Sequence, residues 1–141
     1  MLPALIRKMH EAKERGNAEV IVWGTGKPRR EFLYSEDMAD ACVMLMSLKN
    51  EAFNAEATQY PPLMNIGCGT DLTVTELAEL VAKTVGFNGV LKFDPCKRDG
   101  TPRKLLDVGR LFSLGWRPAI ALEDGIKAAY LDFLQRQPVS A

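Results

Sequence analysis

Short strand-like runs alternate with amphipathic helical segments along this chain, and this alternation restricts the fold class. The strand-like runs are few and short, so they predict a small sheet with packed helices rather than a full doubly wound sheet. The expected class is therefore α/β with an α+β character. The predicted helices and strands cover, in chain order, residues 3–15 (helix), 19–23 and 31–34 (strands), 35–48 (helix), 63–66 (strand), 73–86 (helix), 90–93 (strand), 107 to about 114 (short helix) and 123–135 (helix).

Apolar residues at helical spacing predict which faces of these helices are buried. Polar residues at the helix starts predict caps: Ser35, Asp107 and the Thr73–Glu76 capping box, with Gly86 ending the helix that this box opens. His10 falls on the side of the first helix that we expect to be exposed. The predicted buried residues are Leu5, Ile6, Met9 and Ala12 in the first helix, Met38, Ala41, Cys42 and Leu45 in the second, and Ile126, Ala129, Tyr130 and Phe133 in the last.

The composition excludes several classes of protein. The 141 residues correspond to about one domain, and 18 basic side chains balance 18 acidic ones. Neither nucleic-acid binding nor membrane-surface binding is expected, because both usually need a surplus of basic residues. Three cysteines and one histidine argue against a disulfide framework and a metal site. Without a membrane-spanning run or a signal-peptide pattern, the predicted compartment is the cytosol.

Two glycine-containing loops resemble cofactor motifs only in part. Gly67-Cys68-Gly69 has the first two glycines of a dinucleotide fingerprint, but the third required position holds Leu72. The loop that begins at Gly24 fails as a phosphate loop, because Pro28 stands where Ser or Thr must follow the lysine. No catalytic set of Ser, His and Asp can be assembled either. The residues themselves therefore predict no cofactor-binding loop and no catalytic residue on this chain.

Basic residues are concentrated in two loops of this neutral chain. Arginine grips phosphate through two parallel hydrogen bonds, so one interpretation is a site for a phosphorylated small molecule. The alternative, two solvated loops, is the commoner case for such sequences. Trp23 stands directly before the first loop, where it either stacks on a base or sugar or fills the core. The acidic residues Asp37 and Asp40 at a helix start are interpreted as structural. The basic residues are Lys27, Arg29 and Arg30 in the first loop and Lys97, Arg98, Arg103 and Lys104 in the second.

Three strings of this sequence resemble segments of one enzyme family. They are VWGTGKPRREFLYSEDMA at 22–39, NIGCG at 65–69 followed by ELA at 76–78, and FDPCKRDGTPRKLLD at 93–107 followed by LGW at 114–116. All three are similar to strings of the GDP-L-fucose synthases, which are extended short-chain dehydrogenase/reductases. The last string is the most specific, and the resemblance covers about residues 1–135.

The resemblance implies a function in nucleotide-sugar metabolism. Members of the family use NADPH to epimerise and reduce GDP-4-keto-6-deoxy-D-mannose to GDP-L-fucose. Their N-terminal Rossmann domain holds NADP and a Ser–Tyr–Lys set, and their smaller C-terminal domain holds the GDP-sugar. This chain resembles only the C-terminal domain. We therefore expect residues 1–141 to form a single nucleotide-sugar-binding domain without the Rossmann domain, with no NADP bound to this chain, inactive in isolation, and derived from a homodimeric parent enzyme.

Matching the family's motifs residue by residue implies five contacts with the GDP-sugar: Lys8, Trp23, Arg30, Asp99 and Lys104. Arg30 is expected to grip the diphosphate, with Lys104 adding positive charge there. Trp23 is expected to pack beside the nucleotide. Asp99 would accept hydrogen bonds from the ribose hydroxyls or from the guanine edge, and the sequence leaves both open.

Two alternatives to this interpretation remain. The chain could be a stand-alone binding or interaction module without catalysis. It could also be the C-terminal domain of another extended-family epimerase or dehydratase that acts on a nucleotide sugar. The string DGTPRK at 99–104 argues against that second alternative.

Overall fold

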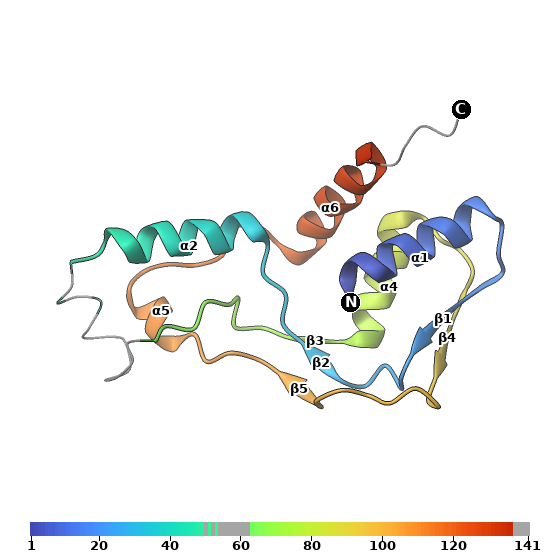
Figure 1. Cartoon of the computed structure of the whole chain (residues 1–141), viewed down its shortest axis with the longest axis horizontal. Coiled ribbons are helices and arrows are strands. Elements are labelled where there is room, and N and C mark those ends of the chain that lie inside the picture. Colours follow the sequence, from blue (N-terminus) through green and yellow to red (C-terminus); the bar gives the residue numbers. More distant parts are fainter. Residues whose placement is uncertain (50, 52, 54–62, 137–141) are drawn as a thin grey trace. The chain divides into compact units, whose positions relative to one another are not determined.

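The chain has a mixed α/β structure, in agreement with the predicted class (Figure 1). The computed structural model describes residues 1–49, 51, 53 and 63–136. Within them lie a two-stranded sheet, β1-β4, and a three-stranded sheet in the order β3-β2-β5. The elements are α1 (Leu2–Glu14), β1 (Glu19–Trp23), β2 (Arg29–Arg30), α2 (Ser35–Ser47), β3 (Leu72–Thr73), α4 (Val74–Val85), β4 (Val90–Asp94), β5 (Arg103–Lys104), α5 (Gly109–Ser113) and α6 (Leu122–Arg136).

Two compact units share the chain, and each is built from separate segments. Unit 1 combines residues 1–29, 72–103 and 123–141, and unit 2 combines residues 30–71 and 104–122. The single domain 1–141 that the sequence predicts is not tested by this division and stays a prediction. The sequence predicts a polar linker within the domain at 50–62, and residues 50, 52 and 54–62 of it lie outside the described part of the chain.

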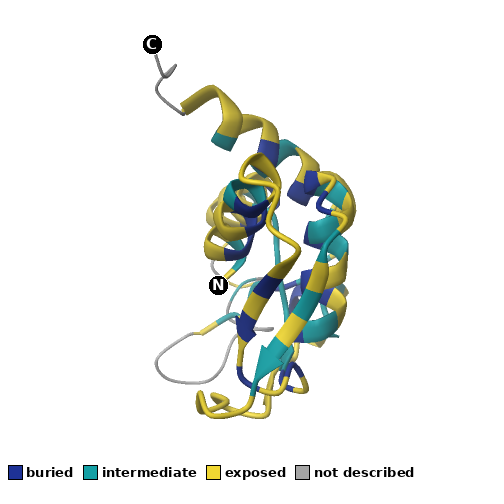
Figure 2. Cartoon of the chain, turned by 90° about the vertical axis from the view of Figure 1, so that its right-hand side faces the viewer, coloured by how far each residue is buried: buried dark blue, intermediate teal, exposed yellow. Residues whose placement is uncertain are grey.

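Unit 1 is organised around the parallel pairing of β1 with β4. The register runs from Glu19 opposite Val90 to Trp23 opposite Asp94. Side chains along β1 alternate between exposed and buried, as Figure 2 shows, with Val20 on the buried face. Because paired parallel strands end at the same edge, the loops that follow Trp23 and Asp94 leave the sheet side by side.

The core of unit 1 comes mainly from helices that pack on this strand pair. Helix α1 contacts both α4 and β1. All four residues predicted for the buried stripe of α1 are buried, which confirms that prediction. In α6, Ile126 and Tyr130 are buried as predicted, whereas Ala129 and Phe133 are only half-buried. Helix α4 contributes Val74, Leu77, Ala78, Val81 and Val85 to the same core.

The prediction that His10 is exposed is wrong. Its Nδ1 lies 3.0 Å from the hydroxyl of Tyr130, and its ring meets that of Phe133 edge-on at 5.3 Å between centroids. His10 is half-buried, because α6 supplies aromatic partners that helical periodicity within α1 cannot reveal. Burial raises the pKa of Tyr130, and the negative charge of Glu14 raises it further.

Unit 2 is held together by a small apolar cluster and two carboxylates. Ala41, Leu111 and Trp116 form the buried centre of the cluster. Asp37 is buried and accepts hydrogen bonds from the backbone N–H groups of Ala119 and Ile120, at 3.1 and 3.0 Å. Asp40 accepts one from the indole Nε1 of Trp116 at 2.9 Å. Both carboxylates are therefore structural, as predicted, although they bind residues distant in sequence and not only the end of their own helix.

The prediction for the buried face of α2 is correct only in part. Ala41 is buried and Leu45 packs against the cluster, but Met38 and Cys42 are exposed. The first helical residue of α2 is Ser35 itself, whereas the sequence predicts Ser35 as the N-cap that precedes the helix. Its N-cap is Tyr34, without a side-chain hydrogen bond, so the prediction that Ser35 caps the helix is wrong.

Two predicted strands, 31–34 and 63–66, are absent from the described residues. At the first of them, side-chain hydrogen bonds replace a strand ladder. The carboxylate of Glu31 accepts from the backbone N–H groups of Gly69 at 2.7 Å and Leu106 at 2.9 Å. At the second, the side chain of Asn65 donates to the carbonyl of Asp107 at 3.0 Å. The two-residue strands β2 and β3 are too short for a periodic pattern to predict.

The caps of α4 are as predicted. The hydroxyl of Thr73 accepts from the backbone N–H of Glu76 at 3.1 Å, and the Glu76 carboxylate accepts from the N–H of Thr73 at 2.7 Å. Gly86 ends the helix with a left-handed φ of 75°. At the start of α5 the prediction that Asp107 caps the helix is correct only in part. Val108 is the N-cap, but the Asp107 side chain accepts from the N–H of Gly109 at 3.0 Å.

We expect Thr73→Ala to lower the free energy of unfolding by about 1 kcal/mol, because it removes the acceptor for one otherwise unsatisfied N–H group of α4. The matched control is Thr84→Ala in the same helix. The Thr84 hydroxyl only donates to the carbonyl of Leu80 within that helix, so its loss is expected to be neutral or slightly stabilising. Urea denaturation of both variants measures the difference. Equal effects of the two substitutions would contradict the role of the capping box.

Candidate functional site

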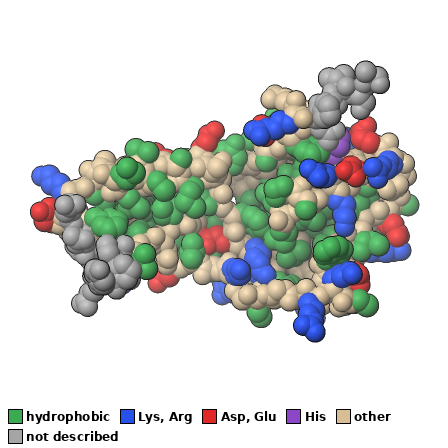
Figure 3. Space-filling model, in the orientation of Figure 1, with side chains coloured by type: hydrophobic (Ala, Val, Ile, Leu, Met, Phe, Trp, Pro, Cys, Tyr) green, Lys and Arg blue, Asp and Glu red, His purple; other side chains and the backbone are tan. Residues whose placement is uncertain are grey.

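A pocket of about 470 Å³ in unit 1 is the best candidate for a ligand site. Its apolar lining includes Leu5 of α1, Val22 of β1 and Val74 of α4, and its polar groups include Lys8. Trp23, at the end of β1, also lines the pocket. Figure 3 shows hydrophobic side chains with Lys and Arg side chains around them over α1 and β1. An apolar cavity with few cationic groups is typical of a site for a small organic anion.

The side chain of Trp23 is free to contact a ligand. Its exposed fraction is 69%, so of the two roles that the sequence leaves open, filling the core is wrong. The ammonium of Lys8 lies 5.8 Å from the centroid of the indole and donates a hydrogen bond to the carbonyl of Ile21 at 2.7 Å. The structure therefore brings together two of the five predicted ligands, an aromatic surface and a cation.

Asp99 joins the two loops that follow β1 and β4. Its carboxylate accepts hydrogen bonds from the backbone N–H of Thr25, at 2.9 Å, and from the Thr25 hydroxyl. Gly24, with φ of +88°, leaves the space that this carboxylate occupies, because a Cβ there would overlap Asp99. Asp99 thus has a structural partner that the sequence analysis missed. Whether it also contacts a sugar or a base stays a prediction.

Several cations of unit 1 surround these two loops. Lys97 places its ammonium 5.5 Å from the centroid of Trp23, a contact that the sequence analysis did not identify. The pairing of Trp23 with Asp94 brings Lys97 close to Trp23. The strands predicted at 19–23 and 90–93 were the available signal for this pairing. Arg29 pairs with Glu76 at 3.9 Å. Among the described residues, Lys97 and Arg98 form no ion pair.

Arg30 and Lys104, the other two predicted ligands, belong to unit 2. Arg30 ends β2 and is half-buried, and Lys104 ends β5 and is exposed. The carbonyl of Lys104 accepts a hydrogen bond from the N–H of Glu31 at 3.2 Å, which brings these two strand ends together. Their role as diphosphate ligands stays a prediction.

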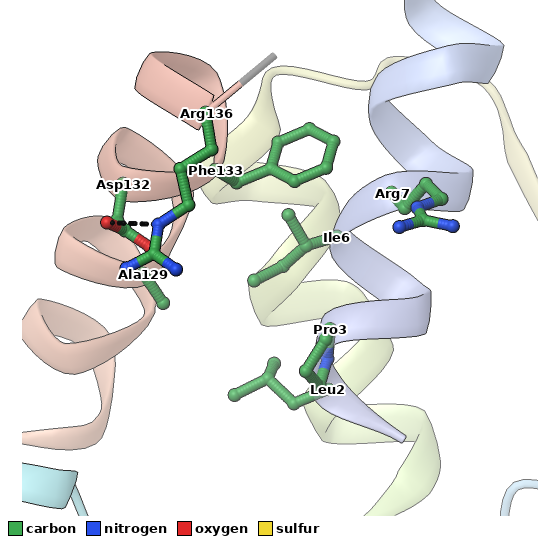
Figure 4. A pocket seen from close by; sticks show the side chains of 8 residues that line it. All are labelled: Leu2, Pro3, Ile6, Arg7, Ala129, Asp132, Phe133 and Arg136. Atoms are coloured by element: carbon green, nitrogen blue, oxygen red, sulfur yellow. Dashed lines mark hydrogen bonds and ion pairs between the residues drawn. The ribbon is translucent and has the colours of Figure 1, made fainter.

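A larger pocket of about 740 Å³ lies between α1 and α6 (Figure 4). Ile6 and Phe133 give it an apolar lining, and Arg7 lies at its edge. Its other charged groups, Asp132 and Arg136, form an ion pair at 2.9 Å and so neutralise each other. None of the five predicted ligands lines it, and we do not assign it to the nucleotide sugar.

In the described residues, no group of three or more His, Cys, Asp or Glu side chains is arranged to hold a metal ion. The helices described here are also too short or too polar to cross a lipid bilayer.

Comparisons with known proteins show that this chain is similar to enzymes that act on nucleotide sugars. A family model described as the NAD dependent epimerase/dehydratase family matches residues 1–67. GDP-L-fucose synthase 1 of Arabidopsis thaliana is 51% identical over 132 residues, which cover 92% of this chain and 38% of that protein. GDP-L-fucose synthase of Escherichia coli (strain K12) is 46% identical over 137 residues, which cover 97% of this chain and 43% of that protein.

A solved structure is also similar. GDP-mannoheptose C4 reductase from Campylobacter jejuni, with NADP bound, superposes with a TM-score of 0.80 and 38% sequence identity over 94% of this chain and 44% of that one. The resemblance to GDP-L-fucose synthases is thereby confirmed over nearly the whole chain. The chain spans 38% and 43% of the lengths of the two curated relatives described above.

We expect Gly24→Ala to destabilise the chain more than Gly115→Ala, because only the first substitution crowds a neighbour. Both glycines have φ of +88°, so the backbone strain is matched at roughly 1–2 kcal/mol. No atom lies within 4 Å of a Cβ placed on Gly115, whereas at Gly24 the Asp99 carboxylate must move and lose bonds to Thr25. That loss adds about 1 kcal/mol, measurable by urea denaturation. Equal destabilisation would show that Asp99 does not hold the loop.

Proposed function

We propose that this chain is the GDP-sugar-binding part of an enzyme of the GDP-L-fucose synthase type, which epimerises and reduces GDP-4-keto-6-deoxy-D-mannose with NADPH. The single observation that carries the proposal is the apolar pocket lined in part by Trp23 and Lys8. Both residues match positions where the resemblance implies contact with the GDP-sugar. In this proposal residues 1–141 act as the C-terminal substrate domain, and the Rossmann domain is a separate part of the parent enzyme.

Each element of the pocket suits part of such a ligand. An exposed indole offers a flat face for a purine, and stacking on it contributes about 1–3 kcal/mol per base. The ammonium of Lys8 is held by the Ile21 carbonyl at the same place and favours a phosphate. Arg30 and Lys104 are proposed to supply further positive charge to the diphosphate, and Asp99 to meet the ribose or guanine.

Binding and orientation are the contributions expected from this chain. A substrate held in reactive geometry can lower a reaction barrier by several kcal/mol. NADP, which supplies the hydride in the parent enzyme, is proposed to bind outside this chain, whose glycine loops lack the fingerprint. Homodimer formation by the parent enzyme and a cytosolic location stay predictions from the sequence.

A second candidate is supported by one comparison. The C. jejuni relative is a reductase of GDP-mannoheptose, so a related GDP-sugar reductase is the nearest alternative to fucose synthesis. The pocket is consistent with either, since the nucleotide is the same. A stand-alone module that binds a nucleotide sugar without catalysis is the remaining alternative.

Binding of GDP to the purified chain is the direct test. We expect a dissociation constant between about 1 mM and tens of micromolar, or roughly 4–6 kcal/mol, because one domain provides only part of the family's binding site. UDP should bind more weakly. GDP should also quench the fluorescence of Trp23, the exposed one of the two tryptophans, since Trp116 is only 6% exposed.

Trp23→Ala should weaken GDP binding about five- to fiftyfold in calorimetry, because the stacking surface is lost. Leu131→Ala is the matched control, since Leu131 is also an exposed hydrophobic residue of unit 1, at 59%, but does not line the pocket. The same loss of affinity in both variants, or no GDP binding by the unmodified chain, would refute the proposed site.

The chain alone should not oxidise NADPH in the presence of the keto-sugar substrate. It has neither a dinucleotide-binding fingerprint nor a YxxxK motif for proton transfer. NADPH absorbance, followed over time with purified chain and substrate, measures this. Turnover above the background without protein would show that the chemical step needs no second domain.

A further inference from the structure

We infer that Lys97 is an additional ligand for the diphosphate group of the nucleotide, acting together with Lys8 beside Trp23. The inference rests on the proposed function, since it names a residue of the same site. The resemblance implies no role for Lys97. Its position in the structure is the reason to assign one.

The sheet register places Lys97 beside the tryptophan. Trp23 and Asp94 are paired at the ends of β1 and β4, so the turn that follows Asp94 lies next to the indole. Two hydrogen bonds fix this turn: the N–H of Cys96 donates to the Asp94 side chain at 3.0 Å, and the N–H of Lys97 to the Asp94 carbonyl at 3.2 Å. The position of Lys97 is thus set by the backbone, and not only by its long side chain.

The ammonium groups of Lys8 and Lys97 therefore both lie near the indole ring of Trp23. Lys8 lies 5.8 Å and Lys97 5.5 Å from the Trp23 centroid, so both ammonium groups are near one ligand that contacts the indole. Each cation is attracted to the face of the ring, but the two cations repel each other. An anion between them relieves that repulsion, so the pair favours a ligand with more than one negative charge.

The segment that holds Lys97 also holds two carboxylates, Asp94 and Asp99, and neither forms an ion pair with Lys97. Asp94 accepts from the N–H of Cys96, and Asp99 accepts from Thr25, so both carboxylates serve the loop backbone. Within the described residues Lys97 has no ion-pair partner, and its side chain is exposed. Its three N–H donors are therefore available to phosphate oxygens.

The test titrates the chain with GDP, guanosine and inorganic pyrophosphate, using calorimetry and the NMR signal of the Trp23 indole N–H. Lys97→Gln removes the charge and keeps most of the length, and Lys97→Arg restores a cation. Arg98→Gln is the matched control, because Arg98 is the adjacent exposed cation without an ion pair in the described residues. We expect Lys97→Gln to weaken GDP and pyrophosphate binding about three- to tenfold and to leave guanosine binding unchanged.

Recovery of GDP affinity to within about twofold by Lys97→Arg, with no effect of Arg98→Gln, would support the inference. Unchanged GDP affinity in Lys97→Gln, or equal losses for GDP and guanosine, would overturn it while the proposed function stands. Binding of pyrophosphate through Lys97 without binding of GDP would retain the diphosphate contact and refute the proposed function. Failure of the unmodified chain to bind either anion would refute both.

Discussion

The parallel pairing of β1 with β4 is the constraint on which the candidate site depends. It fixes Trp23 opposite Asp94, and thereby brings two loops that are about seventy residues apart in sequence to one edge of unit 1. The hydrogen bonds between Asp99 and Thr25 then join those loops. Ligands commonly bind outside the carboxyl ends of parallel strands, and this small sheet places its aromatic and cationic side chains at such an edge. The position of each proposed ligand in unit 1 therefore follows from backbone geometry.

Elements with strong local signals could be predicted from the sequence, and elements that depend on distant partners could not. The buried stripe of α1 and the capping box of α4 are encoded within one or two turns of helix. The side chain of Glu31 instead bonds to Gly69 and Leu106, 38 and 75 residues away, and the strand predicted at 31–34 is absent. His10 is similar, since its partner Tyr130 is 120 residues distant. Local periodicity contains no information about such contacts.

For the candidate site too, individual residues could be predicted, but contacts between residues distant in sequence could not. Lys8 and Trp23, two residues that the resemblance assigns to the sugar site, lie close together. The exposure of Trp23 follows from the alternation of burial in β1, which the sequence does not show because residues 20–23 are all apolar. The hydrogen bonds of Asp99 with Thr25 could not be predicted, because a carboxylate in a loop has no sequence signal for its partner. The contact of Lys97 with Trp23 could not be predicted for a related reason, since it requires the exact register of two separate strands.

The division of unit 1 into three segments has a consequence for synthesis on the ribosome. Ile126 and Tyr130 belong to its core, yet they are translated long after α1 and α4. Until those residues emerge, the apolar faces that α6 covers remain in contact with water, and the early helices cannot complete their packing. Unit 1 can therefore complete its core only after its third segment has been synthesised. The chain is in this respect the opposite of a protein that folds progressively from its N-terminus.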